Sequence, residues 1–219
     1  MRTDEVLRLD NLSCRKKRLN ATTSGISLSV SAGEYKTIVA ETGADSADLL
    51  PLITGEIKVI SGSGTLLGYP LQKMSSWRRR QLLQQIGILS RIDPATSDAT
   101  VSEFLALPLR IAGVAPSQIN SRIRSILNNL ELILQTNQPL LALSPAQLRM
   151  AALAQALIKS PRLIIAELRN DQFDNQITIP ILQRQSTHGA AVLTMSDSEP
   201  SPIHPDTTNY REIEYNVAL

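Results

Sequence analysis

The sequence predicts an α/β protein whose sheet is interrupted by a block of consecutive helices. Short apolar runs at residues 35–40, 86–89, 163–166 and 190–194 are typical of buried strands. Residues 26–31 alternate apolar and serine side chains, which is the period of a strand with one buried face. Between about residues 100 and 160 the pattern changes to helical spacing, which indicates a helical insertion.

The amino-terminal half combines strands with one predicted helix. Residues 6–12 form a short β-like run, and Ala32-Gly-Glu34 reads as a turn before the buried run at 35–40. The small, polar segment 41–48 is followed by apolar residues at helical spacing, ended by Gly55. Pro51 falls inside this helix, so we expect it in the first turn, where proline is tolerated.

The insertion carries clear helix signals. A helix over residues 100–110 is ended by Gly113, and Pro116 begins an amphipathic helix. Ser144 and Pro145 supply an N-cap and a first-turn proline for the helix over 146–159, which is rich in small residues. Further along, residues 198–208 predict a loop and residues 209–217 a weak edge strand.

Composition excludes several kinds of protein. The 219 residues carry 22 basic and 20 acidic side chains, a net charge of +2, which is too balanced for a dedicated nucleic-acid binder. A single cysteine, Cys14, excludes an internal disulfide and a cysteine-based zinc cluster, and two histidines exclude a histidine-rich metal site. Since we find neither a membrane span nor a signal peptide, we expect a cytoplasmic protein.

The order of segments resembles the nucleotide-binding subunit of ATP-binding-cassette (ABC) transporters, nearest the small bacterial subgroup that serves cell division and lipoprotein release. The resemblance rests on order and spacing over almost the whole chain. Its segments are Ser31-Ala-Gly-Glu34 before the phosphate loop, Ile38 to Leu50 at the loop and its helix, Thr100 to Gly113 in the insertion, Leu143-Ser144 at the signature, Ser160 to Glu167 at the Walker B strand, and Leu193 to Asp197 at the switch.

The resemblance implies a P-loop NTPase-like ABC ATPase fold with a mixed sheet core, amino-terminal antiparallel strands and a helical subdomain. The chain is then a single domain over residues 1–219, with the helical subdomain at about 92–160.

The phosphate-loop positions depart from the family pattern. Such a loop needs glycines for close backbone approach, a lysine for the phosphates and a hydroxyl for Mg²⁺. Gly43 is kept, but Ala40 and Asp45 replace two glycines, Ser46 replaces the lysine and Ala47 replaces the hydroxyl. Carboxylates in and beside this loop would also repel a triphosphate. We therefore interpret residues 41–48 as a solvated turn rather than a working phosphate site.

The other nucleotide-site positions are read in the same way, as remnants of a site. The signature serine stays, but a proline follows it and removes one backbone N–H. The Walker B acid and the D-loop aspartate could each be an ordinary exposed acid. The remaining positions are Arg91 near the Mg²⁺-sensing glutamine, Ser144 in the signature, Glu167 in Walker B, Leu168 at the catalytic base, Asp174 in the D-loop and Ser196 at the switch histidine.

Taken together, these residues predict a non-enzymatic, catalytically inactive subunit without cofactor, metal or nucleic acid. It would act structurally or in regulation, on the inner face of the cell membrane. The resemblance implies an integral-membrane permease as partner, and a homodimer or a heterodimer with an ATPase subunit. Two alternatives stay open: an atypical but working ATPase subunit, and a scaffold or regulator of the cell envelope or division machinery without transport.

The resemblance also places permease docking between Arg91 and Gly113. The predicted contact residues are Arg91, Phe104, Leu107 and Arg110. Phe104 is an anchor of the interface or part of the insertion's own core. The basic run Arg78-Arg-Arg80 is read as solvated charge, with anionic lipid as the alternative, and Trp77 as a packing anchor.

Overall fold

The structure is a computed structural model that describes residues 4–15, 22–39, 46–54, 56–90, 98–169 and 171–196. It divides into two compact units. The first unit comprises Met1–Leu83 with Ile165–Leu219, and the second comprises Gln84–Ile164. The predicted tail strand at 209–217 and the predicted loop at 198–208 lie outside the described residues.

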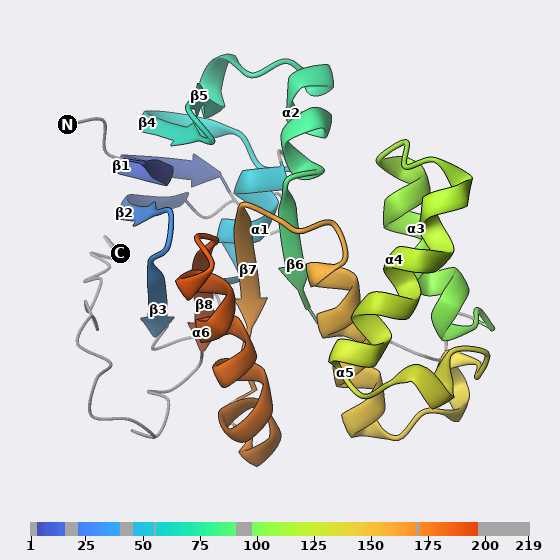
Figure 1. Ribbon diagram of the computed structural model, residues 1–219. Helices are drawn as coiled ribbons and strands as arrows, with labels where there is room; N and C mark the ends of the chain where they lie inside the picture. Colours follow the sequence, from blue (N-terminus) through green and yellow to red (C-terminus); the bar gives the residue numbers. More distant parts are fainter. Residues whose placement is uncertain are drawn as a thin grey trace. The chain divides into compact units, whose positions relative to one another are not determined.

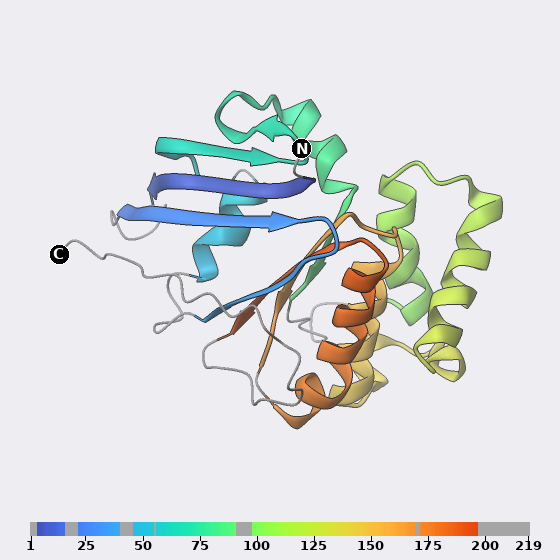
Figure 2. The ribbon, with the colours of Figure 1, turned by 60° about the vertical axis from the view of Figure 1, so that its left-hand side comes forward.

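The first unit contains an antiparallel sheet of four strands in the order β2-β1-β4-β5 (Figure 1). Its strands are β1 (Glu5–Arg15), β2 (Thr22–Ser31), β4 (Val59–Leu66) and β5 (Tyr69–Pro70). Strands β1, β2 and β4 run side by side in both ribbon views (Figures 1 and 2). The sequence did not predict β4, because glycine and serine break its apolar pattern.

Gly62 shows why β4 carries glycine where a strand normally has a side chain. A Cβ atom at this position would lie 2.2 Å from the main-chain oxygen of Asn11 in β1. The φ angle of Gly62 is also +80°, in the region that favours glycine. Close backbone approach between β1 and β4 therefore excludes a side chain here.

The second sheet has the strand order β3-β8-β7-β6. In the first unit, β3 (Tyr35–Val39) pairs in parallel with β8 (Ala191–Ser196), and β7 (Leu163–Glu167) ends in this unit. Every residue of β8 is buried, as the continuous apolar run predicted. In the second unit, β6 (Ile86–Leu89) lies beside the start of β7, where the amide of Arg162 donates to the Gln85 carbonyl at 2.8 Å.

The helices of the first unit are partly predicted. They are α1 (Ser46–Thr54), the 3₁₀ turn η1 (Leu71–Lys73), α2 (Ser76–Leu83), the π-helical turn η5 (Asp174–Thr178) and α6 (Ile179–Thr187). Pro51 lies beyond the first turn of α1, which corrects that prediction. The buried side chains of Leu52 and Ile53 show that packing overrides the cost of proline. The Pro51 carbonyl accepts the Glu56 amide at 2.8 Å just beyond the helix.

The second unit is helical around a small core. Its helices are α3 (Val101–Ile111), α4 (Pro116–Asn129), the 3₁₀ turns η3 (Ile133–Gln135) and η4 (Leu140–Ala142), and α5 (Pro145–Leu157). Helices α3, α4 and α5 pack against one another. The predicted starts at Pro116 and Pro145 are confirmed.

Helix α5 packs closely on β6, which explains its many small residues. A Cβ atom at Gly87 would lie 2.3 Å from the Ala156 main-chain oxygen, so this contact depends on glycine in the strand. The small side chains Ala151, Ala152 and Ala154 are buried in the same helix. The small alanine side chains thus allow α5 to pack closely against β6.

Candidate functional site

The carboxyl ends of parallel strands in the first unit define the candidate site. Strands β3 and β8 are in register, so that Val39 and Ser196 are paired at their ends, and Glu167 ends β7 next to β8. Helix α1 begins at Ser46, soon after β3. In open α/β sheets, ligands bind outside the carboxyl ends of the strands, and helix N-termini attract anions.

Hydrogen bonds between neighbouring strands fix this edge. The hydroxyl oxygens of Thr37 and Thr194 lie 2.8 Å apart and are buried, which ties β3 to β8. The amide of Leu168 donates to the Met195 carbonyl at 2.8 Å, which ties the end of β7 to β8. The strand ends are therefore held rigidly, as a site for positioned chemistry requires.

Glu167 and Leu168 occupy adjacent positions with different surroundings. Glu167 is half-buried and is not without a polar or electrostatic interaction, so the prediction of an ordinary exposed acid is wrong for this residue. Its carboxylate is an oxygen ligand of the kind that Mg²⁺ prefers. Leu168 is buried and apolar, and it offers no group that could accept a proton.

Asp174 is fully buried, so the prediction of an ordinary exposed acid is wrong for this residue too. Its Oδ2 atom accepts the amide of Arg169 at 2.7 Å, and its Oδ1 atom accepts the hydroxyl of Thr178 at 2.7 Å. The amide of Asp174 donates to Asp171 at 2.8 Å. Asp174 thus closes the turn after β7 and begins the π-helical turn, a feature that often marks functional sites.

The remaining predicted positions are placed only in part. Ser196 ends β8 and is buried, and Ser46 and Ala47 begin α1. Gly43, Asp45 and Arg91 lie outside the described residues.

Ser144 lies in the second unit as the N-cap of α5. Its hydroxyl accepts the amide of Gln147 at 3.2 Å, and the Gln147 side chain accepts the amide of Ser144 at 2.9 Å. This is a complete capping box, with Pro145 at the first helical position. The predicted N-cap is confirmed, and the serine hydroxyl is engaged in holding the helix start.

Three of the four predicted docking residues lie on α3, and the fourth, Arg91, lies outside the described residues. Leu107 is 53% exposed, Arg110 is exposed one turn later, and Phe104 is half-buried. Ile111, four residues after Leu107 and 65% exposed, extends the same face and was missed by the sequence analysis. We define the α3 face as Leu107, Arg110 and Ile111. Only the periodicity of α3 could have identified Ile111.

A capping box at the start of α3 holds this helix in place. The amide and hydroxyl of Thr100 donate to the Glu103 carboxylate at 2.9 and 3.0 Å, and the Glu103 amide donates back to the Thr100 hydroxyl at 3.2 Å. These hydrogen bonds lower the pKa of Glu103 below its ordinary value. The largest contribution comes from the hydrogen bond that the main-chain amide of Thr100 donates.

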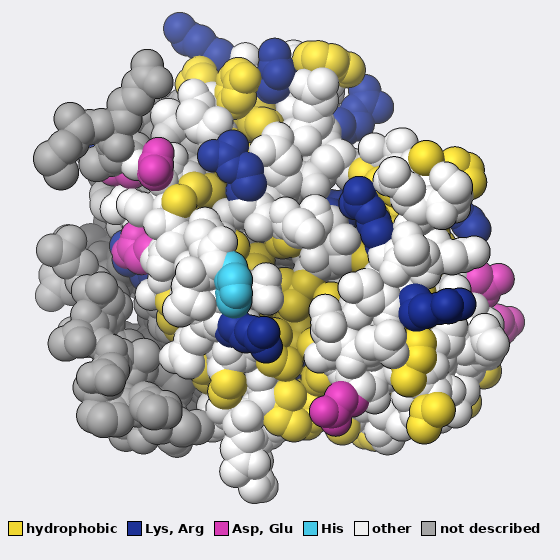
Figure 3. Space-filling view, in the orientation of Figure 1, with side chains coloured by type: hydrophobic (Ala, Val, Ile, Leu, Met, Phe, Trp, Pro, Cys, Tyr) yellow, Lys and Arg dark blue, Asp and Glu magenta, His cyan; other side chains and the backbone are white. Residues whose placement is uncertain are grey.

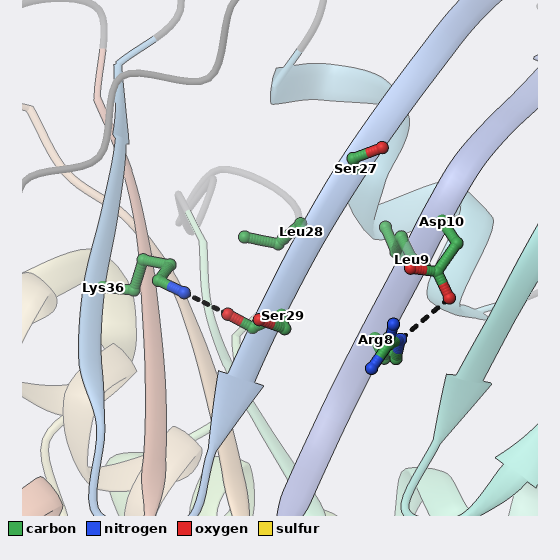
Figure 4. Close-up of a pocket in the computed structure, with 7 residues that line it drawn as sticks. All are labelled: Arg8, Leu9, Asp10, Ser27, Leu28, Ser29 and Lys36. Carbon is green, nitrogen blue, oxygen red and sulfur yellow. Dashed lines mark hydrogen bonds and ion pairs between the residues drawn. The ribbon is translucent and has the colours of Figure 1, made fainter.

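A polar cavity of about 250 Å³ lies between β2, β1 and β3 in the first unit (Figure 4). Its two cations are already paired. Arg8 contacts Asp10 at 2.8 Å, and Lys36 contacts Glu34 at 2.8 Å and donates to the Ser29 carbonyl. This pairing favours a structural interpretation of the cavity over a ligand site.

The family of the chain follows from its sequence. A family model described as ABC transporter matches residues 23–167, which is more than half of the chain. The chain belongs to the ABC transporter family. The matched segment runs from β2 to Glu167 and therefore includes the carboxyl ends of β3 and β7.

Solved ABC cassettes share the fold. One is cbiO1 of Clostridium perfringens, part of the ABC transporter complex cbiONQ, at 19% identity and a TM-score of 0.75, covering 91% of this chain and 82% of that one. Another is MJ0796, a bacterial ABC transporter cassette solved as a dimer, at 19% identity and a TM-score of 0.73, covering 88% of each chain. The predicted ABC ATPase fold, with antiparallel strands preceding a parallel sheet and a helical insertion, is confirmed.

Family membership also corrects one prediction. The interpretation of the chain as a non-enzyme is wrong, because ABC transporter ATP-binding domains typically hydrolyse ATP. It gave too much weight to single side chains such as Ser46. Main-chain N–H groups and a helix N-terminus also bind phosphate, and neither depends on those side chains.

Two further findings concern membrane-spanning helices and the environment of Trp77. No helix among the described residues is long and apolar enough to span a bilayer. Trp77 is 58% exposed, so its predicted role as a packing anchor is wrong.

Proposed function

We propose that this chain is an ATP-binding subunit that docks on an integral-membrane permease, at the cytoplasmic side of the membrane, through the α3 face. The exposure of Leu107 and Ile111 carries the proposal. Neighbouring large aliphatic side chains on one helix surface, with Arg110 beside them, are typical of a protein interface. The prediction that Arg91 also contacts the permease stays part of this proposal.

The proposal assigns ATP to the carboxyl edge of β3, β8 and β7. The start of α1 at Ser46 supports this assignment, because a helix N-terminus binds phosphate without a lysine. Glu167 would hold Mg²⁺, which neutralises phosphate charge when it accompanies the nucleotide. Leu168 supplies no base, so water activation in this chain needs a group other than the side chain at that position.

A second ABC ATPase subunit, identical or different, completes the proposed assembly. The dimeric cassette among the similar structures supports a paired arrangement. We propose the helical part at about 92–160 as a subdomain of a single ABC domain, with Ser144 presenting the amino end of α5.

Purification of the tagged full chain from detergent-solubilised native membranes tests the docking. The wild type is expected to retain a polytopic membrane partner, and Leu107→Asp combined with Ile111→Asp is expected to lose it. The matched control is Leu134→Asp with Leu141→Asp, which adds the same charges at exposed leucines in η3 and η4. Equal retention by both double variants would contradict docking through the α3 face.

Calorimetry with Mg-ATP tests the nucleotide assignment separately. Binding by the wild type, weakened by Glu167→Gln only when Mg²⁺ is present, is the expected result. Absence of binding by the full chain and its assembled complex would refute the nucleotide assignment and leave the docking proposal standing.

A further inference from the structure

A second exposed surface lies in the first unit around α2. Trp77 and Tyr69 are 58% and 40% exposed, and Lys73 and Arg80 are also exposed. With Arg78, these residues define the α2 surface. In Figure 3, hydrophobic and basic side chains gather along the top of the view, over β5 and α2.

The aromatic rings of this surface are organised by a cation. The guanidinium carbon of Arg78 lies 4.7 Å from the ring centre of Tyr69 and 5.1 Å from that of Trp77. Both distances are typical of cation–π contacts. Arg78 therefore contacts both exposed rings of this surface.

Arg79 has a different role from its neighbours. Its guanidinium donates to the carbonyls of Leu52, Ile53 and Leu71 at 2.9–3.3 Å, and burial lowers its pKa from the ordinary value. It thereby fastens α2 to the end of α1 and to η1. Arg80, the next residue of the same helix, is exposed to solvent.

The segment of the sequence that carries the α2 surface has charges of one sign. The sequence contains no acidic residue between Glu56 and Asp93, a stretch that includes Lys58 and every basic residue of the α2 surface. A protein of net charge +2 thus concentrates its positive charge beside exposed aromatic rings. Such a surface attracts an anionic partner at short range.

We propose that the α2 surface binds the headgroup region of a membrane that contains anionic lipids. Tryptophan and tyrosine favour the interface between apolar chains and water, and arginine and lysine beside them pair with lipid phosphates. Nucleic acid is the competing anion, but the guanidinium of Arg78 already covers one face of each ring and competes with base stacking. This inference is independent of permease docking.

The chain contains a single tryptophan, so its fluorescence reports directly on the proposed site. The full chain is titrated with protein-free vesicles of phosphatidylcholine alone and of equal parts phosphatidylcholine and phosphatidylglycerol. We expect a blue shift and protection from acrylamide quenching with the anionic vesicles only, and both effects should fade as salt rises.

Two matched variants locate the binding surface. Lys73→Glu with Arg80→Glu is expected to lower partitioning onto anionic vesicles at least about 20-fold, from the per-charge contribution of a surface cation. Arg122→Glu with Arg124→Glu makes the same net charge change at exposed positions of α4 and should have little effect. Lys73→Gln with Arg80→Gln gives a milder change that keeps the test valid if the reversal lowers stability.

Each of three results would overturn the proposal. The first is no shift with anionic vesicles, and the second is equal loss in both charge-reversed variants. The third is binding to single-stranded RNA, by the same fluorescence, under conditions in which the anionic vesicles are not bound.

Discussion

Helices α2 and α3 both expose large apolar side chains, but these side chains and their neighbours differ in chemistry. On α2, Trp77 lies beside Arg78 in a stretch without acids. On α3, Leu107 and Ile111 are aliphatic, and the acidic residue Glu103 completes the capping box at the start of the helix. Exposure alone therefore does not specify the kind of partner, whereas the side chains around the exposed residues do.

The physical reason is that the two kinds of side chain differ in how much free energy they gain when water is removed from them. Aliphatic side chains gain free energy only when a partner removes them from water, about 25 cal/mol per Å² of apolar surface buried. An indole ring with neighbouring cations is stable at a hydrated interface, because its polar edge and the cations keep their contacts with water and phosphate. The α3 face therefore suits a protein, and the α2 surface suits lipid headgroups.

The largest expected effect is a separation of the two proposed binding functions. Leu107→Asp with Ile111→Asp should weaken permease binding by about 100-fold or more, as the loss of two central anchors does, and leave vesicle binding unchanged. Lys73→Glu with Arg80→Glu should do the reverse. Parallel affinity measurements with the permease and with anionic vesicles check this, and loss of both by either variant would remove the distinction.

Phe104 and Trp77 should differ in their contributions to folding. Phe104 is half-buried, which is intermediate between a core position and an interface position. Phe104→Ala should therefore lower the free energy of unfolding by about 2 kcal/mol, less than for a fully buried ring. Trp77 is exposed, so Trp77→Ala should lower the free energy of unfolding by less than about 0.5 kcal/mol. Urea unfolding followed by circular dichroism measures both, and a larger loss at Trp77 would show that α2 depends on its ring.

Adjacent arginines on α2 should also differ. Arg79→Ala leaves carbonyls at the end of α1 without their donor and should cost about 1–3 kcal/mol. Arg80→Ala should be nearly neutral, since Arg80 is exposed. Similar melting temperatures for the two variants would mean that Arg79 does not fasten α2.

The smallest expected effect is a pH dependence confined to α3. Because the pKa of Glu103 is lowered in the folded chain, its carboxylate stabilises the helix above the ordinary glutamate value of 4.5. This contribution is lost as the pH falls through the lowered pKa. The protection factors of amides in the first turn of α3, which correct for the slower intrinsic exchange in acid, should therefore fall below pH 4.5 in the wild type, and Glu103→Gln should lack this change.

Local signals predicted the helices of the second unit well. The starts at Pro116 and Pro145 depend on proline and capping chemistry within a few neighbouring residues, which the sequence displays directly. Strand β4 was missed because Gly62 is required by a backbone far away in the chain. Helix α2 was missed because its buried face is short and its surface is basic.

The site was predicted less completely than the fold. The positions of Glu167, Leu168 and Ser196 at strand ends follow from strand order, which the resemblance supplied. The burial of Asp174 depends on the amide of Arg169 and the hydroxyl of Thr178, contacts that no spacing rule predicts. Activity was misjudged because side-chain identity says little about what main-chain groups contribute.

Hydrogen exchange on the assembled complex tests the central claim, docking through the α3 face, most directly. The full chain is compared alone and in its detergent-solubilised complex with the permease. If the α3 face docks on the permease, residues 104–113 become strongly protected on assembly. Residues 133–142, where Leu134 is 86% exposed, change little. Protection of residues 133–142 without protection of residues 104–113 would contradict docking through the α3 face.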